Sequence, residues 1–186
     1  SIDTLFNITR FLESTNEKLR AVEYYEQLAL IYRKAARKRE EAETLLNIGD
    51  VYVKLKQAPK AAEYFERSLG VYRGAEAEEE GRTYVKIGNI YDISGDRARA
   101  SSYYEQAIRH LQASLPALQT RKDQSARAGY ALYYLSLAYE GLGDSRRALD
   151  YTRQALPLFR ALGDSVMEAV LDIRLEELTQ TVKDTP

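Results

Sequence analysis

The sequence predicts an all-α protein, a right-handed α-solenoid of stacked antiparallel helix pairs with about four units and a C-terminal capping helix. Three observations predict it. One pattern recurs along the 186-residue chain without internal gaps. Apolar residues within each copy recur at helical spacing. Turn residues separate the two halves of each copy. Since one helix pair cannot bury its own apolar face, successive pairs must stack to share a core.

The repeat is clearest in three segments, which begin at Leu45, Tyr84 and Leu132. The first half of each segment holds a small residue, which is Gly49, Gly88 or Ser136. The second half holds an alanine, which is Ala61, Ala100 or Ala148. We expect these small residues to face one another, so that the two helix backbones approach closely. Large side chains then fill the space on either side, namely Tyr52, Tyr91, Tyr139, Phe65 and Tyr104.

We expect a single array over residues 1–183. Its units are about 2–39, 40–75, 76–119 and 120–162, followed by a capping helix over 164–183 and a tail over 184–186. The first unit is a degenerate copy of the pattern. Gly95-Asp96 and Gly143-Asp144 each supply a left-handed residue and then a cap for the next helix. Ala58-Pro59 marks the corresponding turn of the second unit, because proline is tolerated in the first turn of a helix. Gly163-Asp164 repeats this signal, but no second helix follows, which predicts a cap.

An insertion lengthens the third unit. Tyr91 follows Tyr52 by 39 residues, whereas Tyr139 follows Tyr91 by 48. The extra residues fall between Ile108 and Leu132, where Pro116 is expected to bend or end a long helix. They form either a surface loop or a lid over the groove. A second proline, Pro157, predicts a kink in its own helix.

The pattern L-x-x-G-x-x-Y, followed by A-x-x-x-Y/F-x-x-A-L/I, resembles the tetratricopeptide repeat. The long period and the Leu-Gly-Asp turn at Leu162 to Asp164 are similar to the subgroup of about 40 residues. That subgroup includes kinesin light chains, Leu-Gly-Asn scaffolds and bacterial signalling proteins. The resemblance implies a module that binds other proteins through a groove lined by the first helix of each pair.

Composition excludes several other classes of function. The chain has no cysteine, which excludes a disulfide framework and thiol catalysis, and His110 is its one histidine. The 27 basic residues balance 28 acidic ones, so no field attracts nucleic acid or an acidic membrane. No apolar run is long enough for a membrane span. The chain begins with serine, and we expect it to be a segment of a longer protein.

Groove positions can be assigned by their offset from the small residue of each first helix. The candidate peptide-binding residues are Asn47, Asp50, Lys54, Arg82, Lys86, Asn89, Tyr130, Tyr133 and Tyr134. An asparagine amide can donate to and accept from an extended peptide, or it can stabilise a neighbouring helix turn. The three tyrosines form either an aromatic shelf for a partner or packing filler.

Arg82 and Lys86 lie four residues apart, so both could reach one carboxylate. With Asn47 they resemble part of the carboxylate clamp of some tetratricopeptide co-chaperones. However, Phe6 and Arg10 stand where that clamp has lysine and asparagine. Arg82 and Lys86 could instead pair with Glu78 or Glu79.

The predicted function is a non-catalytic scaffold that binds a peptide or helix of another protein, in the cytoplasm. We expect no enzyme activity, no cofactor, no metal, no nucleic acid partner and no membrane insertion. The alternatives are a self-associating arm, forming a homodimer, of a larger signalling or assembly-factor protein, and less favourably a carboxylate-clamp module.

Overall fold

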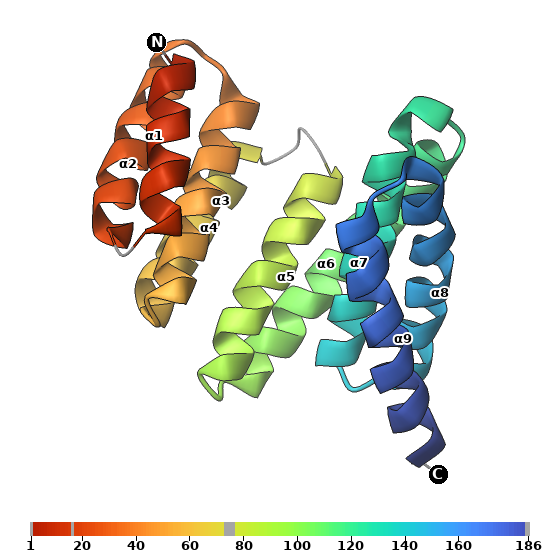
Figure 1. Ribbon diagram of the computed structural model, residues 1–186. Coiled ribbons are helices and arrows are strands. Elements are labelled where there is room, and N and C mark those ends of the chain that lie inside the picture. Colours follow the sequence, from red (N-terminus) through yellow and green to blue (C-terminus); the bar gives the residue numbers. More distant parts are fainter. Residues whose placement is uncertain (1, 16, 73–76, 185–186) are drawn as a thin grey trace. The chain divides into compact units, whose positions relative to one another are not determined.

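The computed structural model describes residues 2–15, 17–72 and 77–184 (Figure 1). Those residues form nine α-helices and one short 3-10 helix, without a β-strand. The α-helices are α1 (Ile2–Ser14), α2 (Lys18–Lys34), α3 (Lys38–Lys54), α4 (Ala58–Tyr72), α5 (Ala77–Ile93), α6 (Arg97–Gln119), α7 (Ser125–Gly141), α8 (Ser145–Leu162) and α9 (Ser165–Asp184). The 3-10 helix η1 (Lys122–Gln124) precedes α7. Adjacent helices pack in antiparallel pairs, which confirms the predicted all-α solenoid class.

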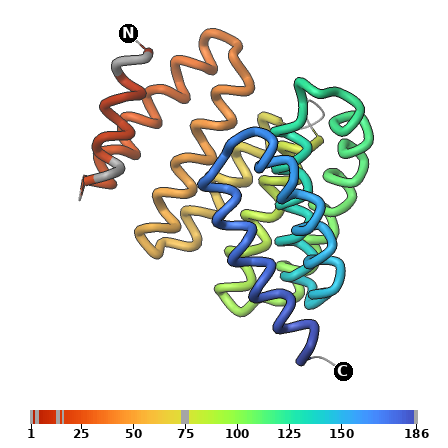
Figure 2. The backbone as a smooth tube through the Cα atoms, turned by 45° about the vertical axis from the view of Figure 1, so that its right-hand side comes forward, coloured from red at the N-terminus to blue at the C-terminus, as the bar shows by residue number. Residues whose placement is uncertain are grey.

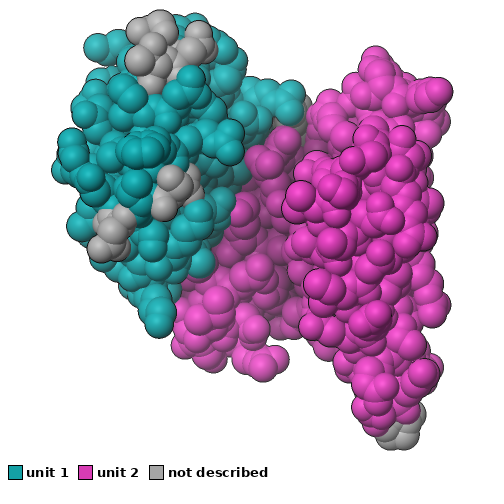
Figure 3. Space-filling model, in the orientation of Figure 1, with its two compact units in different colours: residues 1–75 teal, residues 76–186 magenta. Residues whose placement is uncertain are grey.

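The chain divides into two compact units, Ser1–Ala75 and Glu76–Pro186 (Figure 3). In the first, α2 packs against α1 and α3, and α3 packs against α4. In the second, α5 packs against α6 and α7, α7 against α8, and α8 against α9 (Figure 2). A single array over 1–183 with four repeat units stays a prediction. Of the predicted tail, Asp184 ends α9, and residues 185 and 186 lie outside the described residues.

Glycine packs differently from the prediction. A Cβ built on Gly49 would lie 2.3 Å from Cε1 of Phe65, and one on Gly88 would lie 2.7 Å from Cε1 of Tyr104. Each glycine therefore faces a large ring of the second helix, and the expectation that small faces small is wrong at these two positions. An aromatic ring can lie flat on a helix backbone only where that backbone has no side chain.

The turns between paired helices follow the prediction in the second unit. Gly95 and Gly143 both have a φ of 81°, and the following aspartates cap the next helix. In the first unit, Ala36 and Lys56 adopt the left-handed conformation, with φ of 55° and 58°. Non-glycine residues take this conformation at a cost, so no glycine marks these two turns. Ala58-Pro59 nevertheless predicts the turn at Lys56, and α4 begins at Ala58.

The prolines do not end their helices. α6 runs for 23 residues through Pro116 to Gln119, so Pro116 does not end the helix, and the alternative that it bends the helix stays a prediction. α8 likewise continues through Pro157 for 18 residues, and the predicted kink at Pro157 also stays a prediction. Each proline removes one backbone donor from its helix.

Candidate functional site

Three of the predicted groove residues surround one small cavity in the second unit. The cavity has a volume of about 60 Å³ and lies where α5 meets α7. Its lining residues are Glu78, Glu79, Arg82, Arg127, Tyr130, Ala131 and Tyr134. We call this set the α5–α7 site. The structure thus brings Arg82 together with Tyr130 and Tyr134, which lie 48 and 52 residues further along the chain.

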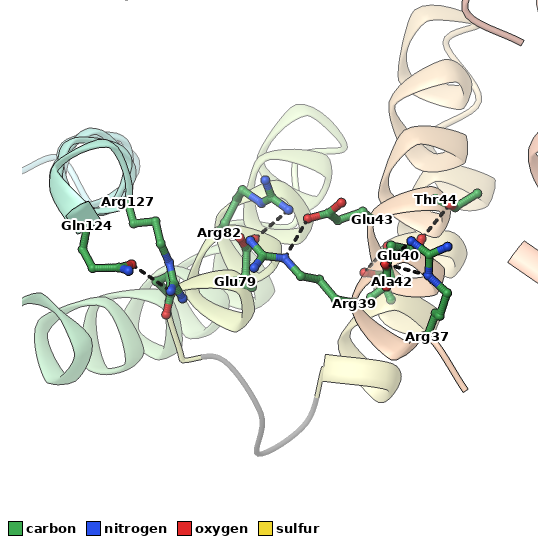
Figure 4. Close-up of polar contacts among 12 residues, drawn as sticks. Arg37, Arg39, Glu40, Ala42, Glu43, Thr44, Glu79, Arg82, Gln124 and Arg127 are labelled. Carbon is green, nitrogen blue, oxygen red and sulfur yellow. Dashed lines mark hydrogen bonds and ion pairs between the residues drawn. The ribbon is translucent and has the colours of Figure 1, made fainter. Parts of the chain in front are cut away.

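Two ion pairs set the charge of the α5–α7 site. Nη2 of Arg82 lies 2.6 Å from Oε2 of Glu79, which is one of the two pairings the sequence left open (Figure 4). Arg127 pairs with Glu78, and its Nη1 also donates to Oε1 of Gln124 over 2.9 Å. The formal charges cancel. An incoming carboxylate would have to compete with Glu79 for Arg82, which weakens the case for a carboxylate clamp.

Tyr130 gives the site an accessible aromatic surface. Its side chain is 40% exposed, and its ring lies edge-on to that of Phe159 with centroids 5.0 Å apart. Partial burial raises the pKa of the Tyr130 hydroxyl, and the nearby Asp164 carboxylate raises it further, whereas Arg82 lowers it. The phenol therefore stays neutral and can donate a hydrogen bond to a ligand at ordinary pH.

Tyr133 is in contact with α9 through Arg174. Its ring lies 5.3 Å from that of Tyr134, and the guanidinium of Arg174 lies 5.7 Å from its centroid. Nη2 of Arg174 also donates to Oε2 of Glu140 over 2.8 Å and to Oγ of Ser136 over 3.0 Å. This arrangement favours packing over ligand contact for Tyr133, since α9 already covers it.

A directed chain of hydrogen bonds starts at Arg174. The Thr152 hydroxyl donates to the carbonyl of Ala148 over 2.9 Å. Its single hydrogen is then used, so the Ser136 hydroxyl, 2.7 Å away, must donate to Thr152. Ser136 in turn accepts from Arg174. The chain ties α9 to α7 and α8 through buried hydroxyls, and it gives α7 a fixed orientation.

The remaining α5 residues contribute less to the site. Oδ1 of Asn89 accepts a hydrogen bond of 2.7 Å from the Tyr104 hydroxyl, which supports the stabilising reading of this amide. Lys86 lies one turn after Arg82 and is half-buried. Burial and the nearby Asp92 raise the pKa of Tyr104 to about 12, so its hydroxyl remains a donor to Asn89.

Asn47, Asp50 and Lys54 lie on α3 in the first unit. Asn47 and Asp50 are half-buried, whereas Lys54 is exposed in the last turn of the helix. Their spacing of three and four residues puts all three on one face of α3. A role for this face in peptide binding stays a prediction.

Sequence reasoning missed Arg127 and Arg174. Arg127 lies in the first turn of α7, before the repeat pattern becomes regular, and Arg174 lies on the capping helix, which has no counterpart in the other units. Arg127 stands out among small residues, which is the signal that could have marked it. Arg174 lies between Asp172 and Glu176, so no contrast with its neighbours marks it.

Among the described helices, none has the length and apolar character needed to cross a bilayer. The side chains that the structure describes also contain no cluster of three or more acidic or histidine residues suited to a metal ion.

Comparison with known proteins identifies the repeat. The family model described as tetratricopeptide repeat matches residues 19–74 and 40–113, and a second model of the same description matches residues 130–156. Together the first two matches span more than half of the chain. No curated protein matches the sequence.

Solved structures share the fold at low sequence identity. The apo form of RapI is 18% identical with a TM-score of 0.61, and the match covers 97% of this chain and 48% of RapI. BtubC from P. vanneervenii is 18% identical with a TM-score of 0.57, covering 84% of this chain and 62% of that one. TPR-like repeats of a kinesin light chain from Podosopora anserina are 15% identical with a TM-score of 0.55, covering 97% and 96%. This chain therefore spans less than two thirds of RapI and of BtubC.

Proposed function

The chain belongs to the tetratricopeptide repeat family, and from this premise we propose that its α5–α7 site binds a peptide or helix of a partner protein, without catalysis. Repeats of this family support a protein-interaction scaffold. Binding through the first helices of the pairs, and a cytoplasmic location, are part of the proposal.

The observation that supports this site most is the combination of accessible aromatic surface with paired charges. Tyr130 is partly exposed beside two arginine–glutamate pairs, and Tyr134 lines the same cavity. Tyrosine and arginine are the residue types that most often dominate binding energy at protein interfaces. The rings offer apolar contact to a partner side chain, and the guanidinium and carboxylate groups offer donors and acceptors to its main chain.

The partner that fits this surface is short and has mixed polarity. A cavity of about 60 Å³ accepts part of one side chain and cannot enclose a whole small molecule. Since the charges within the site cancel, electrostatic attraction contributes little to the encounter, and specificity depends on shape and hydrogen bonding.

A second candidate function is self-association through α9. Val166 is 72% exposed and Ile173 is 58% exposed, and both lie on the side of α9 away from the core. Light scattering over a range of concentrations tests this candidate. A homodimer through α9 should dissociate in Ile173→Glu, whereas a mass that is monomeric at all concentrations contradicts it.

Peptide display tests the main proposal. Random peptides would be selected on the wild-type chain, and their affinities measured by calorimetry for the wild type, Tyr130→Ala and Arg82→Ala. Each substitution should weaken binding about tenfold or more, as expected of an interface hot spot. Glu105→Ala is the control, because Glu105 is exposed on α6, outside the site.

The proposal fails if the selected peptides bind Tyr130→Ala and Arg82→Ala as tightly as the wild type. Thermal unfolding of each variant separates loss of a contact from loss of the fold. Tyr130 is partly exposed but packs against Phe159, so its truncation should lower the melting temperature modestly and leave the chain folded at the temperature of the binding measurement.

A further inference from the structure

A second cavity in the second unit lies away from the α5–α7 site. It has a volume of about 440 Å³ and opens between the end of α6, the start of α7 and the middle of α8. The apolar part of its lining consists of Leu118, Ala128, Leu132, Pro157 and Leu158. The polar part consists of Gln119, Ser125 and Gln154. We call this cavity the α6–α8 pocket.

The insertion in the third unit builds this pocket. α6 has 23 residues, whereas α4, the second helix of the preceding pair, has 15. The added turns of α6 continue past Pro116 and place Leu118 against the core, where it packs with Ala128 of α7. Gln119 at the end of α6 and Ser125 at the start of α7 then line one side of the pocket. The insertion thus has a structural consequence that neither a bare loop nor a lid describes.

Among the residues that the structure describes, no charged side chain lines the pocket. All eight lining residues are neutral, although 30% of the residues in the chain are charged. A charged ligand group placed there would lose hydration without gaining an ion pair, which is strongly unfavourable. An apolar group would instead release water from the surfaces of the leucines, which is favourable in proportion to the area buried.

The rim offers hydrogen bonds suited to a main chain. Gln119 and Gln154 are exposed amides that both donate and accept. Ser125 adds a hydroxyl that can also donate and accept. Neutral donors and acceptors around an apolar floor match a peptide segment, which pairs polar main-chain groups with an apolar side chain.

We propose that the α6–α8 pocket is a second docking site, which receives an uncharged aliphatic or aromatic side chain from a segment of a partner protein. A volume of about 440 Å³ lies within the range of known ligand pockets, so one large side chain and its flanking main chain can enter. This site is independent of the α5–α7 site and does not rest on the function proposed for it.

Titration of the labelled chain with two small probes tests the pocket. N-acetyl-L-phenylalanine amide carries an uncharged aromatic side chain, and N-acetyl-L-aspartic acid amide is the charged counterpart. Amide chemical shifts of residues 118–132 and 154–158 are followed by NMR. The phenylalanine probe should cause saturable shifts in these segments, and the aspartate probe should cause none at the same concentration.

Two pocket variants and one control complete the test. Gln154→Trp and Gln119→Trp replace exposed rim residues by a ring that occupies the pocket. Each variant should therefore bind the phenylalanine probe at least fivefold more weakly than the wild type. Glu105→Trp adds the same ring elsewhere on α6 and should leave the affinity unchanged. Shifts that do not saturate, equal responses to both probes, or equal affinity in both rim variants and the wild type would overturn the proposal.

Discussion

The hydroxyl oxygens of Ser136 and Thr152 lie 2.7 Å apart. At the equivalent positions of the two preceding helix pairs, a glycine packs against an aromatic ring. The equivalent contacts are Gly49 with Phe65 and Gly88 with Tyr104. Both solutions bring the first and second helix of a pair close together. One uses the absence of a side chain, and the other uses a buried hydrogen bond.

Thr152→Val should destabilise the fold by about 1–3 kcal/mol, because Ser136 would keep a buried donor with no acceptor. Both hydroxyls are fully buried. Thr181→Val is the matched control, since the Thr181 hydroxyl also bonds a carbonyl of its own helix but is exposed. Chemical denaturation measures both variants. Equal losses of stability would show that the Ser136–Thr152 bond is not a specific support.

Gly49→Ala should lower the free energy of unfolding of the first unit by about 1–3 kcal/mol, the usual cost of overpacking a core. The added Cβ would lie 2.3 Å from Phe65, which is itself buried. Gly70→Ala is a control in the same unit, because a Cβ at Gly70 meets nothing within 4 Å. Alanine there should stabilise α4 by about 0.4–1 kcal/mol. If thermal unfolding gives both variants the same sign, the ring contact does not explain the glycine.

Stability should fall as the pH rises from about 10 to about 12. Burial raises the pKa of Tyr104 to about 12, whereas tyrosine in an unfolded chain titrates near 10. Between these values the unfolded state loses the proton first, so deprotonation favours unfolding. The contribution of protonated Tyr104 to the free energy of unfolding is fully present below about pH 10 and is lost as the pH approaches about 12, the pKa of Tyr104 in the folded state.

Tyr104→Phe removes that titrating group and should flatten the alkaline part of the stability profile, measured by denaturant unfolding at several pH values. The variant also loses the bond to Asn89, which lowers stability equally at all pH values. Tyr64, whose pKa burial and Glu26 raise to about 12, leaves a residual slope. A slope that Tyr104→Phe leaves unchanged would contradict the assignment.

Arg174→Met should loosen α9. The variant keeps much of the apolar stem but loses the hydrogen bonds to Ser136 and Glu140. A hydrogen bond to a charged group contributes about 1.5–3 kcal/mol, whereas the exposed pair with Glu140 contributes about 0–1 kcal/mol. Hydrogen exchange should accelerate at least tenfold for amides of α9 relative to those of α7. Arg153→Met is the control, because Arg153 is an exposed arginine on α8. Exchange rates in α9 that equal the wild type would mean that apolar packing alone holds the helix.

Much of the fold follows from the sequence pattern. Helical spacing of apolar residues predicted the paired helices, and the Gly-Asp turns predicted the caps at Asp96 and Asp144, which accept from the backbone of Arg99 and Arg147. These features depend on neighbours within a few residues, so a local pattern contains the information. The left-handed turn at Ala36 lacks a glycine and gave no such pattern, whereas the turn at Lys56 was marked only by the Ala58-Pro59 that follows it.

Less of the candidate site was predictable. The offset rule brought Arg82, Tyr130 and Tyr134 to one cavity, because residues at equivalent repeat positions face the same side. It could not choose Glu79 over Glu78 as the partner of Arg82, because both are within reach on the same helix turn. It also missed Arg174, whose contacts with α7 depend on the packing angle of the capping helix.

The most direct test of the account is an NMR map of a display-selected peptide bound to the labelled chain. The account predicts that the largest amide shift changes fall on α5 and α7 around Arg82, Tyr130 and Tyr134. Changes confined to α6, α8 or α9, with these three residues unaffected, would contradict binding at the α5–α7 site.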